Sequence, residues 1–112
     1  MDKIKKYQEI IIALLKEYEI YLSGSSSEVK DEFLIDVERN HYQMVSVGWE
    51  KGHFFYTVAF HIDIIGEQVW LQINNTEFSI MKELIERGIP KSDIVLGFLS
   101  PAMRERSDFA VA

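Results

Sequence analysis

The chain has 112 residues, of which 47% are hydrophobic and 27% charged, and these proportions predict one globular domain over residues 1–112. Cysteine is absent, which excludes a disulfide framework, a cysteine-ligated metal centre and a thiol nucleophile, and which is compatible with a reducing cytoplasm. The 18 acidic and 12 basic residues give a net charge of −6, so the chain alone should bind nucleic acid poorly, because that affinity comes mostly from Lys and Arg.

The first predicted element is an amphipathic helix from Lys3 to Leu22, which Asp2 can cap. Its apolar residues stand alternately three and four positions apart, which keeps them on one helix face. The apolar run at residues 10–15 is far shorter than the roughly 20 residues needed to span a bilayer. We therefore expect neither a membrane span nor a signal peptide. The helical stripe consists of Ile4, Tyr7, Ile11, Leu14, Tyr18 and Tyr21.

A flexible Ser/Gly connector at residues 23–27 leads into four runs of alternating side chains. These runs, residues 33–38, 44–49, 54–65 and 69–74, predict four strands joined by short turns and hence an antiparallel meander. His41 and His53 fall in the turns. Strict alternation in the third run places Phe54, Tyr56, Val58, Phe60, Ile62 and Ile64 on one face, and Phe55, Thr57, Ala59, His61, Asp63 and Ile65 on the other.

A second helix is predicted after the strands. Thr76 is its expected N-cap, and Gly88 stands where a left-handed residue ends a helix. Beyond it come a short apolar run at residues 94–96 and a single helical turn opened by Ser100 and Pro101. The chain ends in an apolar tail at residues 109–112, which would fray in water unless docked. It can dock on its own core or on another subunit.

Together these elements predict an α+β fold: an N-terminal helix, a four-stranded antiparallel meander sheet, a second helix and a short C-terminal strand or turn segment. Both helices should cover one face of the sheet. The other face is too apolar to be left entirely in water, which indicates self-association into a homo-oligomer or binding of a partner.

The sequence lacks the standard catalytic motifs, including GxGxxG, the P-loop, HExxH, GxSxG and SxxK. His61 and Asp63 would share one face of a strand, and Gln72 on the neighbouring strand could join them. Such a pair suits a divalent metal or acid–base chemistry, but two polar residues at this spacing more often form a hydrogen-bonded patch. No third ligand is identifiable, so we assign no catalytic, cofactor-binding or metal-binding residue.

The remaining candidates are aromatic and basic. Trp49 and Trp70 are expected to be core or interface anchors rather than ligand platforms. Arg104 and Arg106, beside Glu105 and Asp108, are expected to form surface ion pairs. The residues that we predict to form a partner or oligomer interface are His61, Asp63, Trp70, Gln72, Arg104, Phe109 and Val111.

Several short segments, ordered along nearly the whole chain, resemble those of a known family. They start at Met1, Asp2 and Lys3 and are strongest at residues 88–98, Gly-Ile-Pro-Lys-Ser-Asp-Ile-Val-Leu-Gly-Phe. The other segments are residues 7–11, 36–43, 47–49, 61–64, 69–72 and 76–77, then Pro101, Arg104 and residues 109–112. In these segments the chain is similar to the XisI family, excision-controlling factors associated with DNA-element rearrangement in cyanobacteria. It departs from the family pattern at residues 65–68 and at residues 99–100.

The resemblance implies an accessory protein that works with a second factor, XisH, to support excision by a recombinase, and it supplies no catalytic residues. We therefore expect a non-enzymatic regulatory protein that needs no cofactor, acts through contacts with an XisH-like partner and resides in the cytoplasm. Two alternatives stay open. One is a direct DNA-binding excision factor that uses the bases Lys3, Lys5 and Lys6. The other is a small metal-binding enzyme that uses His61 and Asp63.

Overall fold

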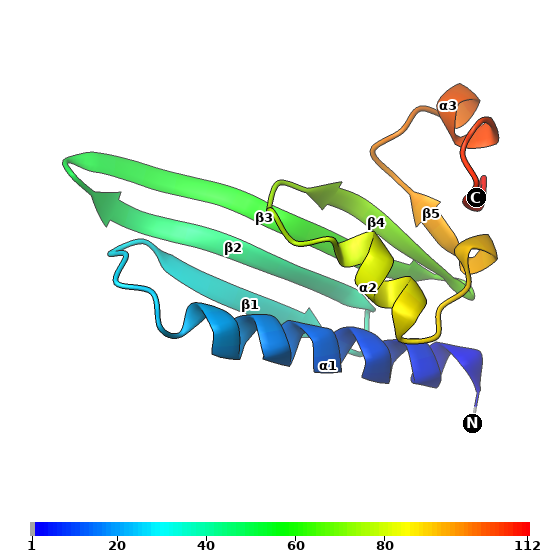
Figure 1. The fold of residues 1–112 in the computed structure, drawn as a ribbon, viewed down its shortest axis with the longest axis horizontal. Coiled ribbons are helices and arrows are strands. Elements are labelled where there is room, and N and C mark those ends of the chain that lie inside the picture. The colour runs from blue at the N-terminus through cyan, green and yellow to red at the C-terminus, as the bar shows by residue number, and fades with distance from the viewer. Residues whose placement is uncertain (1) are drawn as a thin grey trace.

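The computed structural model describes residues 2–112, so Met1, the first residue of the family-like segments, lies outside it. A long helix, a four-stranded meander, a second helix and a C-terminal segment follow one another along the chain (Figure 1). Their order confirms the predicted α+β class. The elements are α1 (Lys3–Leu22), β1 (Lys30–Asp36), β2 (His41–Glu50), β3 (His53–Ile65), β4 (Gln68–Asn74), α2 (Ile80–Glu86), the 3-10 turn η1 (Lys91–Asp93), β5 (Ile94–Leu96) and α3 (Pro101–Glu105).

The strands form one sheet in the order β1-β2-β3-β4-β5 within residues 2–112. The first four pair antiparallel, as the meander prediction requires. The short C-terminal run becomes a fifth strand, β5, which pairs in parallel with β4. Parallel neighbours need a crossover, and the segment containing α2 provides it between β4 and β5.

One hydrophobic core lies between the helices and the sheet. Figure 1 shows α1 running along β1 and α2 in front of the sheet. Buried side chains of α1, of β2 to β5 and of α2 belong to the same cluster, so both helices cover one face, as predicted. We call the opposite face of the sheet the outer face. The fully buried large side chains of the core include Tyr7, Ile11, Leu14, Tyr42, Phe60, Ile62 and Leu84.

A β-bulge in β3 changes which side chains face the helices. Met44 pairs with Phe60, whereas the next residue, Val45, pairs with Val58, so Ala59 is an additional residue in β3. Paired residues share a face, and successive residues along a strand alternate. Because Phe60 belongs to the core, Val58 faces the outer side.

The strict alternation predicted for residues 54–65 is therefore wrong before the bulge. Phe54 and Tyr56 lie on the outer face together with His61 and Asp63, although the sequence pattern placed the two pairs on opposite faces. Phe55 turns towards the side of the helices. The physical reason is that one extra residue shifts the two-residue period by half a repeat.

The strands β2 and β3 project past the rest of the sheet as a ribbon (Figure 1). Lys51 and Gly52 both have positive φ, 51° and 79°, the conformation that a tight two-residue hairpin turn requires. The strand β4 pairs with β3 only from Phe60 to Ile65. The preceding part of β3 therefore has no strand on that side among the described residues.

The helix ends match the predictions with one exception. The Asp2 side chain accepts a hydrogen bond from Lys5 N at 2.7 Å, and Ser100 caps α3 in the same manner. Gly88 ends α2 with φ of 113°, as expected. Thr76 is not the N-cap, because α2 begins four residues later at Ile80. Its hydroxyl instead donates a hydrogen bond to Asn74 Oδ1 and accepts one from the Phe78 N–H, within a turn.

The C-terminal tail docks on its own chain. The Ala110 N–H donates to the Ile94 carbonyl at 2.8 Å, and Phe109 packs at the border of the core. Val111 stays 53% exposed. Of the two alternatives for the tail, the structure supports docking on its own domain for Phe109, and it leaves Val111 free for another contact.

Candidate functional site

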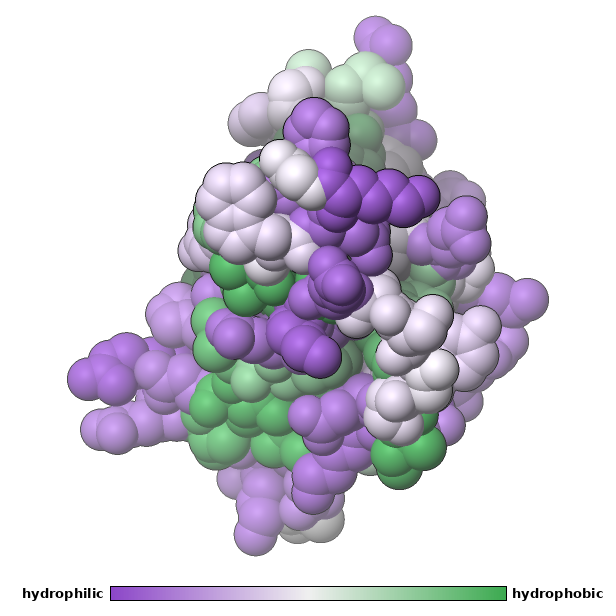
Figure 2. Space-filling view, turned by 90° about the vertical axis from the view of Figure 1, so that its left-hand side faces the viewer, coloured by the Kyte–Doolittle hydropathy of each residue, from purple (hydrophilic) through white to green (hydrophobic). Residues whose placement is uncertain are grey.

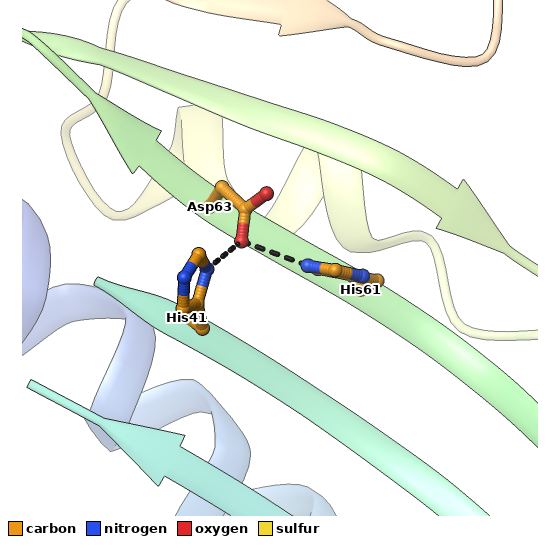
Figure 3. A group of neighbouring side chains, drawn as sticks. All are labelled: His41, His61 and Asp63. Atoms are coloured by element: carbon orange, nitrogen blue, oxygen red, sulfur yellow. Dashed lines mark hydrogen bonds and ion pairs between the residues drawn. The ribbon is translucent and has the colours of Figure 1, made fainter. Parts of the chain in front are cut away.

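A polar cluster on the outer face brings together side chains from two neighbouring strands. The antiparallel register sets His41, the first residue of β2, opposite Asp63 of β3. His41 Nδ1 lies 2.7 Å and His61 Nε2 lies 2.8 Å from the same oxygen, Asp63 Oδ1. Figure 3 shows both rings pointing towards that carboxylate. The sequence predicts a turn at His41. In the structure His41 is instead the first residue of β2 and belongs to the cluster.

The carboxylate of Asp63 is the buried centre of this cluster. Asp63 is 8% exposed, and it is the only charged residue among residues 2–112 that is buried. Burial raises its pKa, but hydrogen bonds with His41, His61 and Gln72 outweigh that effect and hold the pKa below the ordinary value. Asp63 is therefore ionised at neutral pH and can serve as an acceptor or as a ligand.

The second carboxylate oxygen is held by Gln72. The Gln72 side-chain amide donates to Asp63 Oδ2 at 3.2 Å. Gln72 is the additional residue of a second bulge, in β4. Its neighbours Leu71 and Ile73 pair with the consecutive residues Ile62 and His61 of β3, so Gln72 has no partner there. A Cβ atom at Gly97 would lie 2.2 Å from Gln72 Oε1. The absence of a side chain at Gly97 thus leaves room for the amide.

Trp70 and Arg104 form a second group beside the cluster. Trp70 pairs with Asp63 across β4 and β3, and the Arg104 guanidinium lies 4.9 Å from the Trp70 ring centre. This cation–π contact replaces the surface ion pair expected for Arg104. Trp70 Nε1 and Arg104 Nε are buried without a hydrogen-bond partner in the described part of the chain.

The projecting end of the ribbon is rich in exposed aromatic side chains. Trp49 is 63% exposed and Tyr56 66% exposed, and Phe54 and Phe55 are about half exposed. Trp49 and Phe54 pair across the hairpin with ring centres 5.3 Å apart. Figure 2 looks at the molecule from this end and shows hydrophobic surface in green beside hydrophilic surface in purple. Trp49 is therefore an exposed aromatic and not a core anchor.

The structure gathers most of the predicted interface residues but not all of them. His61, Asp63, Gln72, Trp70 and Arg104 form one contiguous group. Phe109 and Val111 lie apart, in the tail beside β5.

The sequence analysis missed His41 as a member of the cluster. The signal was the register of the β2–β3 hairpin: counting pairs back from the two-residue turn at Lys51 and Gly52 aligns His41 with Asp63 only if the bulge is included.

The bases considered for DNA binding lie at the start of α1. Lys3 Nζ forms an ion pair with Asp93 at 3.2 Å, and the same carboxylate accepts a hydrogen bond from the Tyr7 hydroxyl. Part of this positive charge is thus compensated within the fold. No helix within residues 2–112 combines the length and apolar character that a membrane crossing requires.

The comparisons with known proteins agree in one family. Residues 1–111 match the family described as XisI protein. An XisI-like protein from Anabaena variabilis is 38% identical, with a TM-score of 0.89 over 97% of this chain and 99% of that one. The fdxN element excision controlling factor XisI from Anabaena variabilis is 31% identical, with a TM-score of 0.85 over 99% and 100% of the two chains. No curated protein matches the chain.

Proposed function

Because the chain belongs to the XisI family, we propose that it is a non-enzymatic accessory protein that controls excision of a DNA element by binding another protein. A relative of the same length carries the name fdxN element excision controlling factor. The partner that fits the family is an XisH-like protein. In this proposal the partner acts on chromosomal DNA, so the two proteins meet in the cytoplasm.

The observation that carries the proposal is the exposed aromatic end of the β2–β3 ribbon. Trp and Tyr dominate binding energy at protein interfaces because they bury large areas at low entropic cost. Trp49 and Tyr56 lie on the same outer face of the ribbon and are each more than 60% exposed. An exposed apolar strand edge invites pairing with another chain unless it is covered. A protein partner, or a second copy in a homo-oligomer, would cover it.

The charge of the chain favours a protein partner over DNA. The net charge is −6, and Lys3 is already paired with Asp93. An acidic protein is repelled by the phosphate backbone but attracted to a basic protein surface. In this proposal the partner, and not this chain, contacts the DNA.

Size-exclusion chromatography coupled to light scattering tests the proposal. It is run on the protein alone and on the protein co-expressed with an XisH-like protein of the same organism. We expect a stable mixed complex. Trp49→Ala should weaken the association roughly 30-fold, as expected for an interface hot spot. Tyr21→Ala is the matched control, because Tyr21 is an aromatic residue that is 74% exposed but lies on α1.

Two results would contradict the proposal. The first is a protein that stays monomeric and ignores the partner at micromolar concentration. The second is a gel mobility shift of DNA by the chain alone, with a steep dependence on salt, which would instead support direct DNA binding.

A further inference from the structure

Three ligand-type atoms of the outer face converge on one point. His41 Nδ1, His61 Nε2 and an oxygen of Asp63 lie within 4.8 Å of one another. They come from adjacent strands of the rigid sheet, and His41 and Asp63 are 22 positions apart in the chain. Sites built on strands hold their side chains more precisely than sites on loops. The cluster is thus fixed by the fold and not by a flexible segment.

Two imidazoles and one carboxylate are a set of donors that transition metals prefer. Zinc takes nitrogen and oxygen ligands at about 2.0–2.2 Å, and open zinc sites use three protein ligands with solvent in the fourth position. Imidazole also suits Ni²⁺ and Cu²⁺, whereas Mg²⁺ and Ca²⁺ favour sets made of oxygen alone. The chemistry of the cluster therefore selects a borderline transition metal.

The present spacing needs a small adjustment to admit such an ion. The nitrogens lie 2.7 and 2.8 Å from Asp63 Oδ1, and tetrahedral ligands of zinc stand about 3.3 Å apart. The His41 side chain is 52% exposed and the His61 side chain 32% exposed, so each ring has room to swing outward by this half ångström. A shallow depression of about 630 Å³, lined in part by His41 and His61, opens the cluster to solvent.

The carboxylate is also supported from behind, as in metal sites. Gln72 donates to Asp63 Oδ2 and leaves Oδ1 turned towards the two imidazoles. Partners that orient a ligating carboxylate in this manner raise metal affinity. A side chain at Gly97 would displace the Gln72 amide, so the local backbone preserves this support.

We propose that His41, His61 and Asp63 bind a divalent transition-metal ion of the zinc class on the outer face of the sheet. The ion ties the start of β2 to the end of β3 and leaves one coordination position open. The site lies on a different part of the outer face from the aromatic end of the ribbon. It does not depend on the excision partner, and its test needs none.

The test uses tag-free full-length protein, stripped with a chelator and titrated with Zn²⁺ alone by calorimetry and thermal unfolding. We expect one ion per chain. The melting temperature should rise by roughly 10 °C when free zinc is about 100 times the dissociation constant. Visible absorption of bound Co²⁺ reports the coordination geometry, and Mg²⁺ should produce no shift.

The variants His41→Ala and His61→Ala should lose measurable zinc binding, and circular dichroism checks that both remain folded. Gln72→Ala keeps every ligand and should bind zinc about 10- to 100-fold more weakly. His53→Ala is the matched control, because His53 is also the first residue of a strand but lies at the far end of the ribbon. Absence of zinc binding by the wild-type chain would overturn the proposal, and so would equal binding by His41→Ala.

Discussion

Tyr18 combines close packing with an unmade hydrogen bond. Its ring stacks on Phe78 with ring centres 4.0 Å apart, and its hydroxyl is buried without a partner within residues 2–112. A buried polar group without a partner costs roughly 1–3 kcal/mol. The aromatic ring stabilises the fold, whereas the hydroxyl weakens it.

Tyr18→Phe should therefore be neutral or raise the free energy of unfolding by about 1 kcal/mol near neutral pH. The variant should differ more at high pH. Burial, followed by the charge of Glu83, raises the pKa of Tyr18 to about 12 from 10.0. A group whose pKa is higher in the folded state contributes stability below the unfolded pKa and loses it as the pH rises through the folded value. Urea unfolding at about pH 7 and about pH 11 measures both effects.

Tyr21→Phe serves as the control for this prediction, because Tyr21 is exposed on the same helix. It should leave both the stability and its pH dependence unchanged. Some alkaline loss will remain in Tyr18→Phe, since burial also raises the pKa of Tyr7 and of Tyr42. A loss between about pH 10 and pH 12 as steep in Tyr18→Phe as in the wild type would contradict the assignment.

Gly48 sets how closely β2 approaches the segment that leads into β1. Its φ is 145°, in the region that side chains rarely adopt. A Cβ atom there would lie 3.2 Å from the Glu28 carbonyl oxygen and 3.3 Å from Val29 Cα. Backbone atoms cannot yield as a flexible side chain can.

Gly48→Ala should therefore lower the free energy of unfolding by about 1–3 kcal/mol. Gly24→Ala is the control, because a Cβ atom at Gly24 meets nothing within 4 Å. It should be neutral or slightly stabilising, since it reduces the freedom of the unfolded chain. Denaturant unfolding compares the two variants. Equal stabilities would show that the close approach to β1 has no energetic effect.

The elements themselves could be predicted from the sequence more fully than their faces. Periodicity located α1 and the meander, because the helical and strand periods differ strongly. The alternation of residues 54–65 gives no sign of the bulge at Ala59, so it predicts the wrong face for Phe54 and Tyr56. The sequence predicts a cap at Thr76, where the structure has a turn, because caps and turns use the same side chains.

The candidate site could be predicted only in part for the same reason. His61 and Asp63 share a face through a local spacing that the sequence displays. His41 joins them through the register of a hairpin whose turn lies ten residues away. Register of this kind depends on turn geometry and on bulges, which a single sequence specifies weakly. The exposure of Trp49 likewise depends on how far β2 and β3 extend beyond the other strands of the sheet.

The ribbon gives the protein an uneven shape. The molecule extends over 43 × 33 × 24 Å, and the exposed aromatic residues gather at the projecting end of β2 and β3. Large exposed apolar patches on small proteins mark contact surfaces. The cluster of His41, His61 and Asp63 lies at the other end of the ribbon, where β2 begins and β3 ends, and the Trp70–Arg104 contact lies beside it. Binding of a partner and binding of a metal can thus be measured separately.

Trp49 offers a direct measure of whether the ribbon is the contact surface. The chain has two tryptophans, and Trp70→Phe leaves Trp49 as the single indole fluorophore. We expect red-shifted emission, readily quenched by acrylamide, from the free monomer because Trp49 is 63% exposed.

In a homo-oligomer or in a complex with an XisH-like protein, the Trp49 emission should shift to the blue and should no longer be quenched by acrylamide. Because burial of an indole removes it from water, the shift reports contact at this end of the molecule and nowhere else. A complex that forms while Trp49 stays fully quenchable would place the contact on another surface, and Arg104, which lies beside position 70, is the next residue to substitute.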